Sequence, residues 1–167
     1  GCLPVIKHAP GHGRATLDSH ESLPRIDVPL VELEHSDFAP FRALGDLPMA
    51  MTAHIVLPEI DPKTPVTQSA GGIAFLRDIG LTHLLMSDDI SMGALIGDVR
   101  TRSEKALAAG CDLVLHCNGD LAEMRVVAEA GSMTADAANR AHIALATRRT
   151  PIDIDIPVLE AEFLSLI

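Results

Sequence analysis

The run His83-Leu84-Leu85-Met86-Ser87 leads directly into Asp88-Asp89, and this succession of a short apolar segment and polar residues decides the fold. A continuous apolar run of this length is typical of a strand that is buried on both faces. Three further runs have the same form, at residues 4–7, 48–53 and 113–116. The sequence therefore predicts four buried strands, each followed by polar or glycine-containing sequence.

Helices are expected between and after these strands, at about residues 31–44, 69–79, 100–109, 120–130 and 134–148. Gly80 and Gly110 stand where a C-terminal cap belongs, and Asp120 and Glu123 have the spacing of a capping box. Strands that alternate with helices indicate an α/β fold with a parallel sheet, either covered on both faces or closed into a barrel. A complete (β/α)8 barrel takes roughly 250 residues, so four strand-helix units are half of one.

Composition excludes several classes of function. Of the 167 residues 47% are hydrophobic, but there is no Trp or Tyr, so an aliphatic core is expected. The net charge of −10 and the lack of a basic run longer than Arg148-Arg149 argue against nucleic acid as a partner. No apolar run approaches the roughly 18 residues of a membrane span.

The three cysteines, at positions 2, 111 and 117, show no CxxC spacing. They favour neither a disulfide framework nor a zinc ribbon, and a reducing, cytoplasmic setting is the simplest interpretation. The sequence begins without Met, and its first residues already have the form of a strand, so we expect a fragment of a longer protein. Residues 151–167 have the character of a loosely packed extension.

The first polar cluster follows the first strand and reads Lys7-His8-Ala9-Pro10-Gly11-His12-Gly13, with Asp18-Ser19-His20 after it. Pro10 and the two glycines exclude a regular helix, so a shaped loop leaves the strand. An Asp two residues before a His can accept a hydrogen bond from one imidazole nitrogen, which leaves the other free to give or take a proton. The alternative is that Asp18 caps a turn and His20 is merely exposed.

The second cluster is Ser87-Asp88-Asp89-Ile90-Ser91-Met92, at the end of the third strand. Adjacent side chains of a strand point to opposite faces, so only one of the two aspartates can enter a barrel mouth, and the other is expected to cap the next turn. A purely structural role for both, as caps or solvated carboxylates, remains open at this point.

Single residues at other strand ends are weaker candidates. His54 either lines a pocket or is a hydrogen-bonded residue behind it, and His116 and Asn118 either contribute to a site or close the end of the barrel. His12, between two glycines, contacts a ligand or braces its loop, and bracing is the favoured interpretation.

The first cluster resembles the long signature of the β-N-acetylglucosaminidases of glycoside hydrolase family 3, the NagZ type. The spacing to Met51-Thr52-Ala53-His54, to Ser87-Asp88-Asp89-Ile90-Ser91-Met92 and to Ala109-Gly110-Cys111-Asp112 is also similar, and the resemblance covers about residues 4–130. It implies a TIM-type (β/α)8 barrel, of which residues 1–150 would be the C-terminal half and residues 151–167 an extension.

The resemblance also implies roles. Asp88 would be the nucleophile and His20 the general acid/base, supported by Asp18, while Lys7, His8 and His54 would bind substrate. The implied reaction is a retaining double displacement that removes terminal N-acetyl-β-D-glucosamine from muropeptides or chitooligosaccharides in cytoplasmic cell-wall recycling, without a metal or cofactor. Because no second carboxylate opposes an incoming anion, phosphate could replace water as the acceptor.

The resemblance is imperfect in two respects, and two alternatives follow. Ala9 stands where the family commonly has Phe or Ile, and the family's earlier strands, which supply further sugar-binding residues, are absent. One alternative is a metal-dependent hydrolase with His8, His12, His20 and Asp88 as ligands. The other is an incomplete half-barrel that is inactive alone and binds sugar or self-associates through its exposed strand edges.

Overall fold

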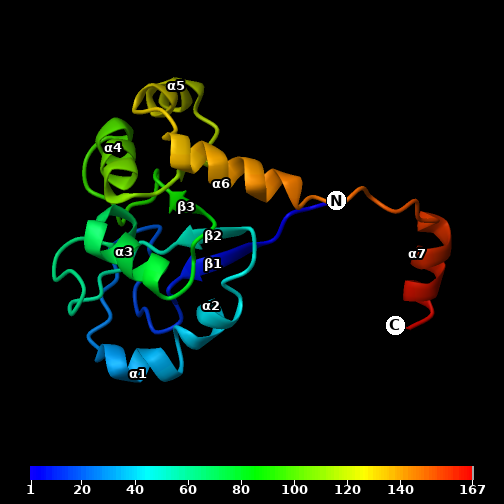
Figure 1. Ribbon diagram of the computed structural model, residues 1–167, viewed down its shortest axis with the longest axis horizontal. Helices are drawn as coiled ribbons and strands as arrows, with labels where there is room; N and C mark the ends of the chain where they lie inside the picture. The colour runs from blue at the N-terminus through cyan, green and yellow to red at the C-terminus, as the bar shows by residue number, and fades with distance from the viewer. Residues whose placement is uncertain (167) are drawn as a thin grey trace.

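The computed structural model describes residues 1–166 (Figure 1). The helices and strands follow one another in the order β1 Val5–Ala9, α1 Leu30–His35, α2 Ala39–Ala43, β2 Met49–Thr52, the 3-10 helix η1 Val66–Gln68, α3 Ala70–Asp78, β3 Leu84–Asp89, α4 Val99–Ala109, β4 Leu113–Leu115, α5 Leu121–Glu129, α6 Ala135–Ala146 and α7 Ile156–Leu164.

The four strands form one parallel sheet in the order β1-β2-β3-β4. Met49 of β2 lies opposite Val5 of β1 and Leu84 of β3, and Met86 lies opposite Leu113 of β4. The predicted α/β fold and its four strands are confirmed. The third strand extends two residues beyond the apolar run, so that both aspartates belong to β3 rather than to the loop after it.

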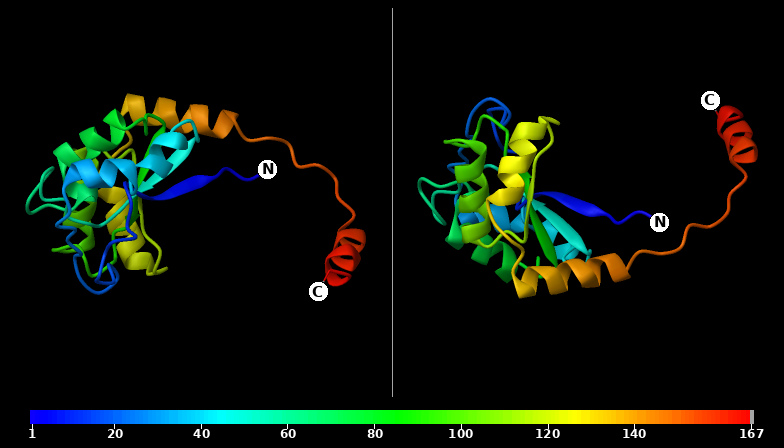
Figure 2. Two further views of the ribbon diagram at one scale, coloured as in Figure 1. Left: turned by 90° about the horizontal axis from the view of Figure 1, so that it is seen from below. Right: turned by 90° about the horizontal axis from the view of Figure 1, so that it is seen from above.

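The aliphatic core lies between the sheet and the helices on its outer face (Figure 2). Leu33 of α1, Leu76 of α3 and Ala106 of α4 are buried there against strand residues such as Leu85. Alternation along each strand then turns Lys7 and Met86 to the opposite face of the sheet. Polar residues at the strand ends that point to this second face are not buried in the core, so they can form a site.

Helix α6 crosses the ends at which the strands begin. Arg140 on α6 pairs with Asp112, directly before β4, with Nη2 and Oδ1 2.6 Å apart. Thr147, just beyond α6, shares a hollow with Pro4 and Pro48, which precede β1 and β2. This end of the sheet is thus covered, and the opposite end, where the strands finish, stays open.

The expected helix at residues 31–44 is wrong, because the chain forms two short helices there. Helix α1 ends at His35 and α2 begins at Ala39, with Pro40 in its first turn. Proline has no backbone N–H to donate to the preceding turn and disfavours helical geometry in the residue before it. Phe38, between the two helices, is buried in the core.

Helix ends were predicted more accurately. Gly110 follows α4 with a φ of 112°, as expected for a C-terminal cap. The capping box at α5 is only half formed: Asp120 accepts hydrogen bonds from the N–H groups of Ala122 and Glu123, but the Glu123 carboxylate does not return to Asp120. It binds His116 Nε2 and Asn118 Nδ2 instead, each at 2.7 Å.

The extension contains a helix that was not predicted, α7. Figures 1 and 2 show it at the end of an extended segment, apart from the rest of the molecule. All described residues from 147 to 166 are exposed, including Phe163 and Leu164. Within residues 1–166, no helix combines the length and apolar character needed to cross a bilayer.

Candidate active site

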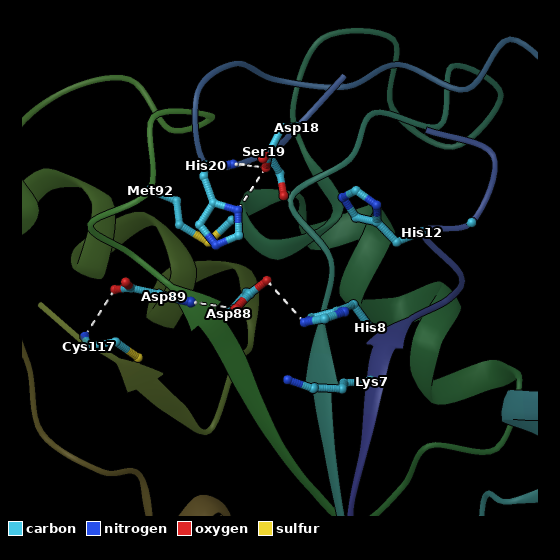
Figure 3. A pocket seen from close by; sticks show the side chains of 11 residues that line it. Lys7, His8, His12, Asp18, Ser19, His20, Asp88, Asp89, Met92 and Cys117 are labelled. Atoms are coloured by element: carbon cyan, nitrogen blue, oxygen red, sulfur yellow. Dashed lines mark hydrogen bonds and ion pairs between the residues drawn. The ribbon is translucent and has the colours of Figure 1, made fainter. Parts of the chain in front are cut away.

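A cavity of about 520 Å³ lies at the open end of the sheet, where β1 and β3 finish (Figure 3). It brings together the two polar clusters of the sequence, which are some 70 residues apart along the chain. The residues that line it are Lys7, His8, His12, Gly13, Asp18, Ser19, His20, Asp88, Asp89, Met92 and Cys117.

His8 connects the two clusters directly. Its Nε2 lies 3.5 Å from Oδ2 of Asp88, and both side chains are largely covered. Burial lowers the pKa of His8, and the Asp88 carboxylate only partly offsets this effect. A neutral imidazole beside Asp88 can take part in hydrogen bonds to a bound molecule without forming a full ion pair with the carboxylate. Lys7, one residue earlier in β1, extends into the same cavity (Figure 3).

Asp18 and His20 form the hydrogen-bonded pair that the sequence suggested. His20 Nδ1 donates to Asp18 Oδ1 at 2.7 Å, which leaves Nε2 free, and the ring points into the cavity above Asp88 (Figure 3). This hydrogen bond and the negative charge of Asp18 raise the pKa of His20. The backbone and side-chain N–H groups of His20 in turn lower the pKa of Asp18. His20 therefore holds its proton to a higher pH than an ordinary imidazole does.

The neighbouring aspartates of β3 have different surroundings. Asp88 presents Oδ2 to the cavity and uses Oδ1 to accept the N–H of Asp89 at 2.8 Å. Asp89 accepts hydrogen bonds from Ser91 N, Ser91 Oγ and Cys117 N. Burial alone raises the pKa of Asp89, but these hydrogen bonds outweigh it and leave the pKa lowered. Asp89 thus caps the turn after β3 and joins it to the end of β4, whereas Asp88 keeps one oxygen for other chemistry.

His54 does not reach the cavity, contrary to the expectation that it contacts substrate. Its side chain is fully buried, with Nε2 3.0 Å from the carbonyl oxygen of Asp89 and Nδ1 2.8 Å from Oγ1 of Thr67. A carbonyl only accepts, so Nε2 carries the proton. Burial lowers the pKa of His54 and favours this neutral ring. His54 lies behind β3 and braces the backbone next to Asp88.

The remaining histidines divide between the site and its surroundings. His12 lines the cavity, packs edge-on against His8 with ring centroids 6.1 Å apart, and has a buried Nε2 without a hydrogen-bond partner among the described residues. His116 and Asn118 bind Glu123 and secure the start of α5. Sequence reasoning missed Met92 and Cys117 as lining residues, although Met92 lies three residues beyond β3 and Cys117 two residues beyond β4.

The ligand set proposed for a metal-dependent hydrolase does not converge. His8, His12, His20 and Asp88 share the cavity, but residues 1–166 contain no group of three or more His, Cys, Asp or Glu placed to hold one ion. Three of these four side chains are instead paired: His8 with Asp88, and His20 with Asp18. Among the described residues, these four side chains are therefore not arranged as one set of metal ligands.

Comparison with known proteins identifies the family. Residues 1–149 match the family model described as the glycosyl hydrolase family 3 N terminal domain. The chain belongs to glycoside hydrolase family 3. The β-hexosaminidase of Bordetella pertussis is 39% identical over 122 residues, and that of Pseudomonas aeruginosa strain PAO1 is 40% identical over 122 residues. These matches cover 70% and 71% of this chain but 35% and 37% of the relatives, so the chain spans about a third of their length.

Solved structures of the family agree with the fold. NagZ from Neisseria gonorrhoeae in complex with N-trifluoroacetyl-D-glucosamine superposes with a TM-score of 0.69 at 34% identity, over 85% of this chain and 43% of that one. A family 3 β-N-acetylglucosaminidase from Paenibacillus sp. strain FPU-7 gives a TM-score of 0.75 at 25% identity, over 92% of this chain and 33% of that one. The four strand-helix units are thus part of a TIM-barrel-like family 3 domain.

Proposed function

We propose that this family 3 chain carries the catalytic elements of a retaining glycoside hydrolase that removes terminal N-acetyl-β-D-glucosamine. The observation that carries the proposal is one cavity in which Asp88 Oδ2, 3.5 Å from His8 Nε2, lies across from the hydrogen-bonded Asp18–His20 pair. A nucleophile and an oriented proton donor on opposite sides of a space are the requirements of double displacement. The β-hexosaminidase names of the relatives support the same substrate class.

In the first step, Asp88 Oδ2 bonds to the anomeric carbon while the bond to the leaving glycosidic oxygen breaks and that oxygen takes the proton of His20 Nε2. In the second step, a water oxygen bonds to the same carbon, the bond to Asp88 breaks, and His20 takes the proton from water. Lys7 and His8 stand beside Asp88, where they would hold hydroxyl groups of the sugar.

The finer assignment is part of the proposal. We infer muropeptide fragments as the substrate, cell-wall recycling as the setting and the cytoplasm as the location. This rests on the likeness to NagZ and on three cysteines that are all free thiols. Chitooligosaccharides offer the same terminal sugar, and phosphate as an alternative acceptor to water would leave a sugar phosphate as product.

A second candidate is a half-barrel that binds sugar or self-associates without turnover. The observation in its favour is that β1 and β4 are both edges of the four-stranded sheet, with backbone groups free to pair with another strand. The two candidates differ in whether this chain, by itself, turns over substrate.

The deciding experiment incubates the chain with a chromogenic aryl N-acetyl-β-glucosaminide. Asp88→Ala is compared with Asp153→Ala in the exposed extension, and His20→Ala with His142→Ala on the exposed side of α6. Turnover that is lost in Asp88→Ala, and reduced in His20→Ala mainly for poor leaving groups, supports the enzyme. A folded wild-type chain that binds N-acetylglucosamine but hydrolyses nothing supports the half-barrel, and sedimentation then shows whether it self-associates.

A further inference from the structure

The position of His20 is not set by packing of its side chain. The side chain is 75% exposed and that of its partner Asp18 is 63% exposed, although both line the cavity. A hydrogen bond between two such exposed groups orients the ring within its own loop but does not place the loop relative to Asp88. Another contact must therefore fix the distance between the acid/base and the nucleophile.

Backbone hydrogen bonds provide that contact. The N–H of Gly93 donates to the carbonyl of His20 at 2.8 Å, and the N–H of Ala94 donates to the carbonyl of Ser19 at 3.1 Å. Ser19 itself is buried. Gly93 and Ala94 belong to the turn that directly follows β3, the strand that carries Asp88. The loop that carries His20 therefore rests on the segment next to the proposed nucleophile.

The turn beneath this contact is held from two sides. Asp89 accepts the N–H and hydroxyl of Ser91, and Arg102 of α4 directs Nη1 toward the carbonyl oxygens of Ile90, Ser91 and Met92 at 3.0, 3.1 and 3.2 Å. These contacts fix the orientation of the peptide planes that precede Gly93. A fixed turn offers its two N–H groups at a defined position, which a flexible turn would not.

The backbone of Gly93 lies too close to the His20 loop to leave room for a side chain. A Cβ on Gly93 would lie 2.7 Å from the carbonyl oxygens of both His20 and Glu21, and real Cβ atoms essentially never come under 3.0 Å. These neighbours are backbone atoms, so they cannot rotate away as the end of a flexible side chain can. Any residue other than glycine must push the His20 loop away from the turn.

We propose that Gly93 and Ala94 form a seat for the His20 loop, and that this seat, supported by Arg102, sets the position of the general acid/base relative to Asp88. Gly93 is thus a positioning residue, and it acts through His20 rather than on the substrate. The proposed role in catalysis rests on the proposed function, but the placement of His20 near Asp88 can be measured without turnover.

The kinetic test compares aryl N-acetyl-β-glucosaminides with good and poor leaving groups. General acid catalysis contributes about 10²- to 10⁴-fold, and poor leaving groups depend on it most. Gly93→Ala should lower kcat/KM for a poor leaving group by about 10-fold or more, within that range, and have much less effect on a good one. Arg102→Met, which leaves Gly93 unchanged, should act in the same direction. The control is Gly71→Ala in α3, where the nearest atom to a Cβ is 3.7 Å away.

The second test follows the ring of His20 by NMR as the pH is changed. The negative charge of Asp88 contributes to the raised pKa of His20. Asp88→Asn should therefore lower the titration midpoint of His20 in the wild-type background and lower it less in the Gly93→Ala background. An equal shift in both backgrounds, or an equal kinetic loss for good and poor leaving groups, would overturn the proposal. If the wild-type chain hydrolyses nothing, the proposed function fails. The titration still tests whether Gly93 and Ala94 set the position of His20 relative to Asp88.

Discussion

Oδ1 of Asp18 accepts two hydrogen bonds from the same residue, one from the backbone N–H of His20 at 2.9 Å and one from its Nδ1 at 2.7 Å. The backbone bond fixes the turn and the side-chain bond fixes the tautomer, so one carboxylate oxygen determines both where the imidazole lies and which nitrogen is free. This relationship makes the pH dependence of the proposed reaction predictable.

Asp18→Asn should move the alkaline limb of the pH profile to lower pH. His20 must be protonated to assist a poor leaving group, so kcat/KM falls as the pH rises through the pKa of His20. Asp18 raises that pKa, so its neutralisation brings the pKa down and activity is lost at lower pH. The measurement is kcat/KM against pH for a substrate with a poor leaving group, with Asp153→Asn as control. An alkaline limb that stays in place would contradict the assignment of His20.

Asp88 and Asp89 should respond to mutation in opposite ways. Asp88→Ala is expected to lower kcat by about 10⁴-fold or more, as removal of a nucleophile does, with little change in the melting temperature. Azide, which fits the vacated space, should restore turnover and yield an α-glycosyl azide. Asp89→Ala removes three hydrogen bonds at the end of β3 and should cost about 2 kcal/mol of stability. Denaturant unfolding measures this cost. A stable Asp89→Ala chain without activity would mean that Asp89, rather than Asp88, is the nucleophile.

The strands and the two polar clusters could be predicted because their signals are local. Each apolar run is a strand, and glycine and Asp or Thr residues mark helix ends within a few positions, as Gly110 and Thr134 do. The break between α1 and α2 was also readable, since Pro40 stood within the expected helix.

What could not be predicted depends on contacts between distant segments. His54 stands at a strand end, as a pocket residue would, but only the packing of η1 and β3 around it decides that it faces inward. The seat at Gly93 is equally hidden, because its partners are carbonyl oxygens more than 70 residues away, and carbonyls leave no mark on the sequence. Side-chain identity predicts chemistry more readily than it predicts such backbone contacts.

The buried imidazole of His54 should make stability fall as the pH is lowered. Its pKa in the folded chain lies below the ordinary value of 6.5, so the unfolded chain takes up a proton first as the pH falls through about 6.5. The free energy of unfolding therefore decreases progressively as the pH falls. His54→Gln should remove part of this dependence between pH 7.5 and 5, whereas His142→Gln on the exposed side of α6 should not. Urea unfolding over this range makes the comparison, and parallel curves for wild type and His54→Gln would contradict it.

The exposed extension should contribute nothing to the stability of the barrel segment. Every described residue of 151–166 is exposed, and the family model ends at residue 149. A chain that ends at Thr150 should unfold at the same temperature and with the same denaturant dependence as the full chain. A clear loss of stability would mean that α7 packs against the remainder in solution.

Asp112 should stabilise the closed end of the sheet at neutral pH and cease to do so in acid. Its side chain is 2% exposed and binds Arg77 Nη2 at 2.8 Å, Arg140 Nη2 at 2.6 Å and the N–H of Leu85 at 2.8 Å. Burial alone raises the pKa of Asp112, but these partners outweigh it and leave the pKa lowered. The stabilisation is therefore present above the ordinary value of 3.8 and is lost as the pH falls through the lower, folded value.

Removing one partner of a buried ion pair typically costs about 3 to 5 kcal/mol, and Asp112→Ala should lie near the lower end because both arginines are partly exposed and can be hydrated. Denaturant unfolding of wild type and Asp112→Ala at pH 7 and near pH 3 measures the difference. The difference in the free energy of unfolding between the two proteins should be smaller near pH 3 than at pH 7. Below about 3.8 the unfolded wild-type chain takes up a proton at Asp112 before the folded chain does. An equal difference in the free energy of unfolding at both pH values would show that Asp112 acts through packing rather than through its charge.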